Sequence, residues 1–126
     1  MQFMFSVIDA EQSWEDLTPE EVKKNLDDMG RFNEELTAAG AMVTGAGLQE
    51  RATGKTVHYG KDGETVVSDG PFSETKEQIA GFWIVELESI DEALAWARKI
   101  PFQGGHVEIR PLVTGGEELI EKAEAS

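Results

Sequence analysis

The sequence predicts an α+β fold in which two β-α-β units form one antiparallel sheet, with helices on one of its faces. Two observations support this prediction. Residues 2–8 and 81–88 are rich in aromatic and β-branched side chains and are expected to be buried strands. A helix with a capping signal follows each of them, at Thr18 and at Ser89. The length of 126 residues fits one domain, which can bury a core without metals or disulfides.

The first helix has the clearest local signal in the chain. Thr18 can cap the free amides, Pro19 suits the first helical position, and Glu21 completes a capping box. Apolar residues then recur at spacings of three and four, which predicts one apolar stripe. The stripe consists of Val22, Leu26, Met29, Phe32 and Leu36. Gly40 is expected to end the helix in a left-handed conformation.

A second strand and a hairpin are predicted next. Residues 41–49 are expected to form the strand, with Gly45 and Gly47 as candidate bulge positions. Residues 53–59 and 64–67 flank a Gly-Lys-Asp-Gly turn. This pattern predicts a hairpin inserted between the two units.

The second unit repeats the order of strand, helix and strand. Its helix is expected to begin with a capping box of Ser89 and Glu92 and to continue through Ile100, where Pro101 halts it. Residues 106–112 are expected to form the last strand.

These elements give the order βαββαβ with a hairpin insertion, which is the order of a ferredoxin-like fold. We expect the domain to span residues 1–114. The acidic tail, residues 115–126, is expected to have some helical character.

The two central strands predict a homodimer. Helices cover one face of such a sheet, so a monomer should alternate apolar and polar residues along these strands. Here both faces are apolar, because Met4 and Ile8 oppose the phenylalanines of the first strand, and Phe82 and Ile84 oppose Trp83. The sheet of a second subunit is the simplest cover for the second face.

Composition excludes several classes of protein. The chain has no cysteine and two histidines, which excludes thiolate chemistry and argues against a histidine-rich metal site. The net charge of −14 repels nucleic-acid phosphates and anionic lipid surfaces. No apolar run approaches the roughly 20 residues of a membrane span, and the start lacks the basic region of a signal peptide. A cytoplasmic location is therefore expected.

One motif is specific enough to indicate a family. Residues 69–77 read Asp-Gly-Pro-Phe-Ser-Glu-Thr-Lys-Glu. Further matches are Phe32-x-x-Glu35-Leu36-x-x-Ala39-Gly40, Gly81-Phe82, Asp91-Glu92-Ala93 and Glu108-x-Arg110-Pro111. With these residues the chain, nearly whole up to Leu112, resembles the YCII-related proteins, and specifically their DGPF-domain branch. The resemblance implies a dimeric α/β barrel of ferredoxin-like protomers.

On function the resemblance implies less. Some relatives resemble dehydrochlorinases or other small-molecule lyases, and DGPF proteins often accompany or fuse with extracytoplasmic-function sigma factors. YCII-type members carry a histidine of a His-Asp dyad on the first helix. Matching the helix end places that histidine at about Met29, and methionine cannot transfer protons. The dyad mechanism is therefore not expected here.

The DGPF loop is the first candidate site. Asp69 can accept hydrogen bonds from amides of the turn, while Gly70 and Pro71 restrict the backbone and Phe72 can anchor it in the core. The same residues fit two roles, a rigid structural loop or the rim of a ligand pocket.

The charged residues after this loop have two interpretations as well. In an extended segment Glu74 and Lys76 share one side and Glu77 faces the other. A buried Lys76 beside Glu74 could transfer a proton or bind an anionic group. An exposed pair would be an ordinary surface ion pair.

Two strands supply the remaining candidates. His58 on the hairpin is either an acid-base group or an exposed residue. His106, Glu108 and Arg110 alternate along the last strand and share one face. If the apolar residues between them pack under the helices, Arg110 faces the dimer cleft. There it can clamp a carboxylate or pair with Glu108.

Three functions fit these residues. The first is a dimeric small-molecule-binding protein, with a pocket between sheet and helix lined by Phe32 and Trp83; it could be a cofactor-free lyase or isomerase. Its candidate catalytic residues are Asp69, Lys76 and His58. Its candidate ligand-binding residues are Asp69, Gly70, Pro71, Phe72, Glu74, Lys76, Glu77 and Arg110.

The second function is a non-catalytic regulatory or protein-binding module, which the methionine at the histidine position favours. The third, weaker, is a metal site that joins His58 or His106 to carboxylates across a dimer. We predict no cofactor and no metal site within one chain. The polar DGPF motif favours small-molecule binding slightly and leaves catalysis open.

Overall fold

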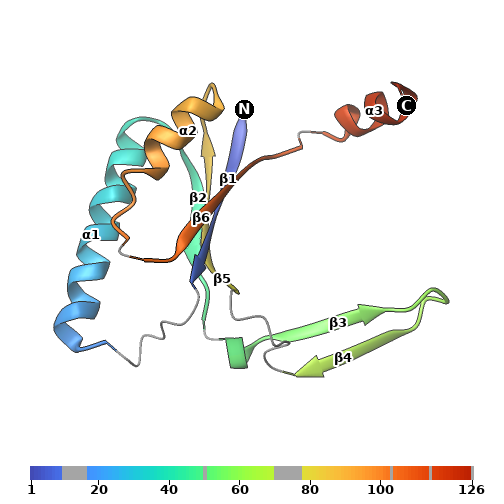
Figure 1. Ribbon diagram of the computed structural model, residues 1–126, viewed down its shortest axis with the longest axis horizontal. Coiled ribbons are helices and arrows are strands. Elements are labelled where there is room, and N and C mark those ends of the chain that lie inside the picture. Colours follow the sequence, from blue (N-terminus) through green and yellow to red (C-terminus); the bar gives the residue numbers. More distant parts are fainter. Residues whose placement is uncertain (10–16, 50, 70–77, 103, 114, 126) are drawn as a thin grey trace.

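The computed structural model describes residues 1–9, 17–49, 51–69, 78–102, 104–113 and 115–125. Its centre is a four-stranded antiparallel sheet with the strand order β2-β5-β1-β6 (Figure 1). The strands are β1 (Gln2–Asp9), β2 (Met42–Gly47), β5 (Gln78–Glu86) and β6 (His106–Pro111). β1 and β5 are the central strands, as predicted. This α+β arrangement is compatible with a ferredoxin-like fold.

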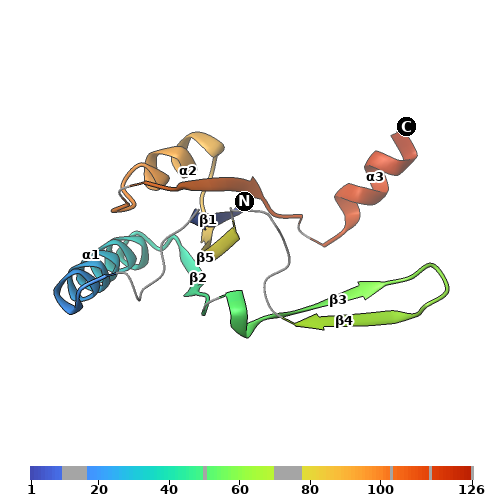
Figure 2. The ribbon, with the colours of Figure 1, turned by 60° about the horizontal axis from the view of Figure 1, so that its bottom comes forward.

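Helices α1 (Pro19–Ala38) and α2 (Ile90–Ala97) lie on the same face of the sheet (Figures 1 and 2). The capping box of α1 forms as predicted. The Glu21 amide donates to Thr18 Oγ1 over 3.1 Å, and the Thr18 amide donates to Glu21 Oε1 over 3.4 Å. Gly40 follows the helix with φ of 72°, the left-handed conformation expected of it.

Helix α2 is shorter than predicted. It ends at Ala97, and the amides of Lys99 and Ile100 donate to the carbonyls of Trp96 and Ala97, three residues back. The last turn is thus tightened to 3₁₀-type bonds before Pro101, so the predicted helix through Ile100 is wrong by one turn.

The start of α2 is also different in detail. The Glu92 amide donates to Ser89 Oγ over 3.2 Å, which is the predicted cap. The Glu92 carboxylate accepts from the amide of Glu88 over 3.0 Å, one residue before the cap. The hydrogen bond to the Ser89 hydroxyl therefore forms as predicted, whereas the Glu92 carboxylate binds the amide of Glu88 instead of the amide of Ser89.

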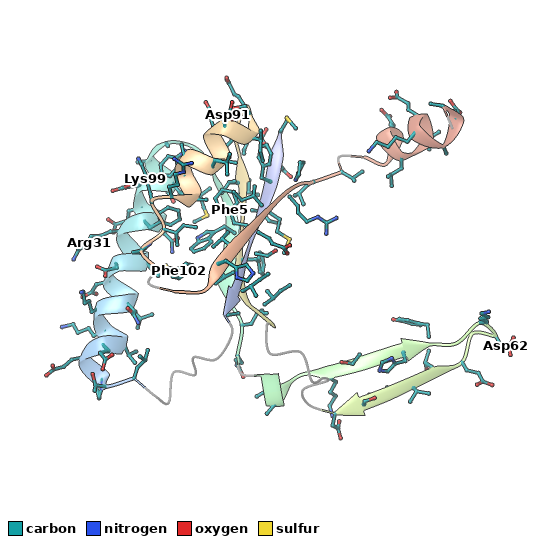
Figure 3. All side chains as sticks on the ribbon, in the orientation of Figure 1. Phe5, Arg31, Asp62, Asp91, Lys99 and Phe102 are labelled. Atoms are coloured by element: carbon teal, nitrogen blue, oxygen red, sulfur yellow. The ribbon has the colours of Figure 1, made fainter. Side chains whose placement is uncertain are left out.

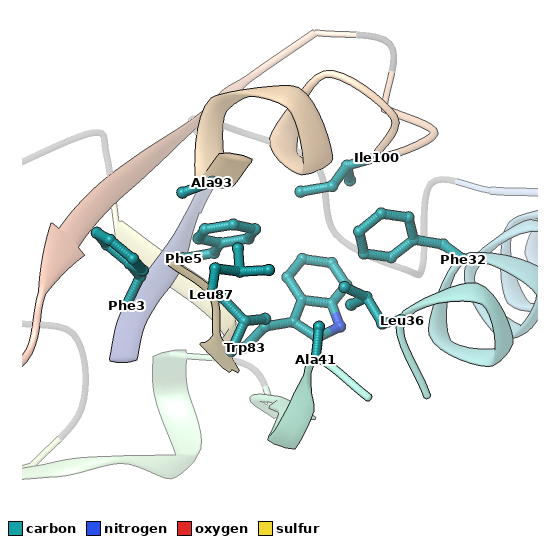
Figure 4. Packing of buried hydrophobic residues seen from close by; sticks show 10 residues of the cluster. Phe3, Phe5, Phe32, Leu36, Ala41, Trp83, Leu87, Ala93 and Ile100 are labelled. Carbon is teal, nitrogen blue, oxygen red and sulfur yellow. The ribbon is translucent and has the colours of Figure 1, made fainter. Parts of the chain in front are cut away.

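The core lies between the helices and the sheet (Figure 4). Its buried residues are Phe3, Phe5, Phe32, Leu36, Ala41, Trp83, Val85, Leu87, Ala93 and Ile100. Phe32 packs edge-on against Trp83, with ring centroids 5.3 Å apart. Trp83 Nε1 donates to Asn33 Oδ1 over 2.8 Å. The C-terminal half of the α1 stripe is therefore buried as predicted, whereas Leu26 is 58% exposed because no described element covers it.

Strand β2 contains a register shift against β5 between Met42 and Thr44. The predicted bulge positions, Gly45 and Gly47, are thus wrong, because both lie after this shift. Gly45 has a different role, because a Cβ built there would lie 2.9 Å from Cδ1 of Trp83. Only glycine lets β2 run this close to the indole.

Two elements extend from the side of the sheet opposite α1 and α2 (Figures 1 and 2). One is the predicted hairpin of β3 (Lys55–Tyr59) and β4 (Thr65–Asp69), preceded by a 3₁₀ turn, η2 (Arg51–Thr53). The other is the C-terminal helix α3 (Glu117–Ala125), which confirms the helical character expected of the tail. Neither packs extensively against another described element. None of the described helices is long and apolar enough to cross a membrane.

Candidate functional site

The face of the sheet opposite α1 and α2, here called the open face, has an apolar centre. Met4 and Ile8 of β1 and Phe82 and Ile84 of β5 are half-buried on it. Met4 lies beside Ile84 in the register of β1 and β5, and Ser6 lies beside Phe82. No described element packs over this face to bury these side chains fully. The apolar second face predicted from the strand pattern is therefore confirmed.

Strand β6 gives the open face a polar border. His106, Glu108 and Arg110 are exposed along it, while Val107 and Ile109 pack against the core beneath the helices, as predicted. Arg110 lies beside Met4 in the register of β1 and β6, at the rim of the apolar centre. The ion pairs of the described residues include none between Glu108 and Arg110. The Arg110 guanidinium is thus not paired with the partner that the sequence suggested.

Asp69 is the last residue of β4 and pairs across the hairpin with Lys55. Both side chains are largely exposed, at 83% and 66%, so the pair contributes about 0–1 kcal/mol. Lys55 was not predicted from the sequence, because a four-residue turn at residues 60–63 would place it opposite Ser68, whereas Tyr59 pairs with Thr65 and Lys55 therefore lies opposite Asp69. The other predicted loop residues lie outside the described residues. They are Gly70, Pro71, Phe72, Glu74, Lys76 and Glu77.

His58 is exposed in the middle of the same hairpin, opposite Val66. Strand alternation places it on the other side of the hairpin from Lys55 and Asp69, because it lies three positions after Lys55 along the strand. Two of the three candidate catalytic residues, His58 and Asp69, therefore do not face the same volume within one protomer.

The aromatic residues expected to line a pocket are mostly part of the core. Phe32 is 4% exposed and Trp83 is 6% exposed. Phe32 alone reaches a small hollow of about 190 Å³ on the helix side, here called the helix-side hollow. Its lining is Asp28, Arg31, Phe32, Glu35, Lys99 and Pro101. The space between sheet and helix is thus filled by packing, and the expected pocket lined by Phe32 with Trp83 does not form there among the described residues.

Two basic side chains, Arg31 and Lys99, border the helix-side hollow, and neither was predicted from the sequence as a site residue. Figure 3 shows Arg31 on α1 and Lys99 just after α2 on the same side of the sheet. Lys99 Nζ lies 4.7 Å from the centre of the Trp96 ring, and an Arg31 nitrogen lies 3.9 Å from an Asp28 oxygen. Residues 31 and 99 both line this hollow because α1 and the segment after α2 pack side by side. No local sequence motif therefore predicts the hollow.

A larger hollow of about 610 Å³ lies at the opposite end of the sheet. Its lining is Met1, Ala39, Ala41, Glu86, Leu87, Glu88, Glu92, Ala95 and Trp96. The terminal amine of Met1 lies 3.5 Å from Glu86 Oε1, and the Glu92 carboxylate accepts from the Glu88 amide. Two of its three carboxylates are thus already engaged.

No group of three or more potential metal ligands occurs within the described part of the chain. Met29, near which the sequence resemblance places the family histidine, is half-buried and packs against the core. Its side chain therefore contributes to packing between α1 and the sheet.

The fold and this open face define a small α+β domain with both core helices on one side of its sheet. Sequence similarity identifies the family. A model of the YCII-related domain matches residues 1–114, so the chain belongs to the YCII-related family. An uncharacterized protein of Rhizobium meliloti (strain 1021) is 37% identical over 97 residues, which cover 74% of this chain and 77% of that protein. Membership of the YCII-related family, as predicted from the motifs, is thus confirmed.

Proposed function

We propose that this YCII-related protein, as a member of the DGPF branch, is a homodimer that binds a small molecule beside its open face. The observation that carries the proposal is the open face itself, with its apolar centre and the polar border along β6. Apolar area left in water costs roughly 25 cal/mol per Å² relative to burial. A second copy that presents the same face covers it by two-fold symmetry and closes two sheets into an α/β barrel.

Arg110 is the proposed anchor for the ligand. It borders the apolar centre beside Met4 and has no described carboxylate partner within ion-pair distance. A guanidinium at the rim of an apolar cleft suits a small organic acid, whose carboxylate it can bind with two parallel hydrogen bonds. In this proposal the DGPF loop forms the rim of the same pocket. Its residues are Asp69, Gly70, Pro71, Phe72, Glu74, Lys76 and Glu77.

Binding is the primary proposal, and a cofactor-free lyase or isomerase activity is the secondary one. Proton transfer would fall to Asp69, Lys76 or His58. His58 and Asp69 lie on opposite sides of the hairpin, so a reaction that used both would draw them from two subunits. We place this function in the cytoplasm.

The test is a thermal-shift screen of the protein against small organic acids, including chlorinated and phenolic ones. A ligand at a hundredfold excess over its dissociation constant adds about 2.7 kcal/mol to stability. The shift produced by a hit is expected to fall in Arg110→Ala and to persist in Arg98→Ala, where an exposed arginine is removed on the helix side.

A third variant, Arg31→Ala, distinguishes the open face from the helix-side hollow. Loss of the shift in Arg31→Ala, with Arg110→Ala unaffected, would overturn the location at β6. A screen without any hit on a well-folded dimer would overturn small-molecule binding.

The second candidate function is a non-catalytic module that binds a protein partner. Met29 favours it, because the position where the family histidine is expected carries a side chain that only packs. A blank screen would support this candidate.

A further inference from the structure

The β3–β4 hairpin is a separate two-stranded sheet. Its strands pair with each other from Lys55 and Asp69 to Tyr59 and Thr65, and they pack extensively against no other described element. A two-stranded hairpin alone is marginally stable in water, because it has no second layer on which to bury apolar area. Among the described residues, nothing provides that second layer.

One side of this hairpin has an apolar stretch, which lies beside the Lys55–Asp69 ion pair on the same side. Strand alternation places Val57, Tyr59 and Val67 together, since Val57 pairs with Val67 and Tyr59 lies two residues beyond Val57. Their exposed fractions are 42%, 81% and 59%. A tyrosine this exposed beside two valines has the composition of an interface centre, where tyrosine is enriched. We call these three residues the arm patch.

The charge of the hairpin favours a second copy of this chain as the occupant. Residues 51–69 contain three basic and three acidic side chains, whereas the whole chain carries −14. A like-charged copy is repelled by most of the surface and least by a segment of zero net charge. Helix α3, by contrast, contains four glutamates and one lysine, which makes it the poorer contact with a second acidic copy.

The position of the hairpin supports the same occupant. It extends on the side of the sheet that carries the open face (Figures 1 and 2). A copy whose open face meets this open face would bring its own apolar surface within reach of the hairpin. Two-fold symmetry then repeats the contact, so that each hairpin crosses to the other subunit.

We infer that the β3–β4 hairpin is an exchanged arm, whose arm patch packs on the sheet surface of the second copy. This inference rests on the proposed homodimer and adds to it a second region of contact between the subunits. The valine and tyrosine side chains of both arm patches are then buried in the dimer interface.

Neighbouring valines of β4 provide the test. Val67 belongs to the arm patch, and Val66 faces the other side of the hairpin with similar exposure, 62% against 59%. Val67→Ser is expected to raise the dimer dissociation constant at least tenfold, as loss of one buried valine on each subunit does. Val66→Ser changes strand propensity equally and should leave the constant within about twofold. Equal effects of both variants, measured by sedimentation, would overturn the exchanged arm.

The absence of cysteine allows a direct second measurement. Two single variants, Tyr59→Cys and Ile84→Cys, are mixed, allowed to exchange subunits and treated with a short bis-maleimide. A cross-linked product that contains one chain of each variant is expected. Lys24→Cys, on the exposed surface of α1, is the matched control and should give no mixed product with Tyr59→Cys.

The outcomes separate this inference from the proposed function. A wild-type protein that sediments as a monomer overturns both. A dimer that cross-links through Ile84→Cys on both subunits, yet never through Tyr59→Cys, overturns only the exchanged arm.

Discussion

Gly45 shows how strongly one neighbour can restrict a residue. Its Cα faces the indole of Trp83, and a built Cβ would lie 2.9 Å from Cδ1 of that ring and 3.1 Å from the carbonyl oxygen of Phe82. Neither atom can retreat easily, because Trp83 also packs on Phe32 and donates to Asn33. The glycine therefore lets β2 pair with β5 beside the indole without a steric clash.

Gly45→Ala is expected to destabilise the protein by about 1–3 kcal/mol, because the added methyl overpacks the contact with Trp83. Gly47→Ala is the control, since nothing lies within 4 Å of a Cβ at that position of the same strand. Urea denaturation followed by circular dichroism measures both. Equal destabilisation by the two substitutions would show that strand conformation, and not the indole, requires glycine.

At the scale of residues, the sequence indicated which positions matter to the structure, but the roles predicted for several of them were wrong. Gly45 was expected at a bulge, but the register shift lies between Met42 and Thr44 because pairing with β5 decides its position. Phe32 and Trp83 were expected around a pocket and instead fill the core. The pattern of apolar residues along one sequence indicates that an aromatic side chain is buried. It does not indicate whether other protein side chains or a ligand cover it.

At the scale of elements, the ends of α1 are set by its own residues. The Thr18 hydroxyl and the Glu21 carboxylate each accept one amide hydrogen bond at the first turn. Such local signals act within a few residues, and this is why the helix and its start were predictable from sequence.

Thr18→Ala is expected to lower stability by about 1 kcal/mol, because it leaves the Glu21 amide without its side-chain acceptor. Thr18→Ser keeps the hydroxyl and should retain most of the wild-type stability. Thermal denaturation of the three proteins tests this. A Thr18→Ser variant as unstable as Thr18→Ala would attribute the loss to the methyl group of threonine instead of to the cap.

Elements whose ends depend on distant contacts were less predictable. Helix α2 stops at Ala97 although Ile100 continues its apolar pattern, because the chain must turn before β6. Leu26 fits the stripe of α1 and is still 58% exposed, since no described part of the sheet reaches it. The helix-side hollow likewise depends on the approach of Arg31 and Lys99 from two helices.

At the scale of the whole molecule, the open face is an apolar surface that no described element of the chain covers. The apolar second face of β1 and β5 followed from sequence, because strand alternation is a local property. In the proposed homodimer the surface that covers it belongs to the second copy, which the pattern of one chain does not describe.

Ile84→Lys tests the homodimer. A charge in the centre of the open face should prevent burial, and the variant is expected to sediment near 13.8 kDa, where the wild type sediments near twice that mass. Leu26→Lys, at an exposed position of α1, should remain dimeric. A dimeric Ile84→Lys variant would show that the subunits associate through another surface.

The two edges of the four-stranded sheet have a further consequence, which concerns aggregation. On β6, the Leu112 amide donates inward to Gln2, so the neighbouring Pro111 faces outward and offers no N–H to an added strand. On β2, the register shift at Val43 distorts the opposite edge. Amyloid-like growth requires a straight edge with free donors and acceptors. Both edges of the four-stranded sheet are therefore poor templates for an added strand of a fibril.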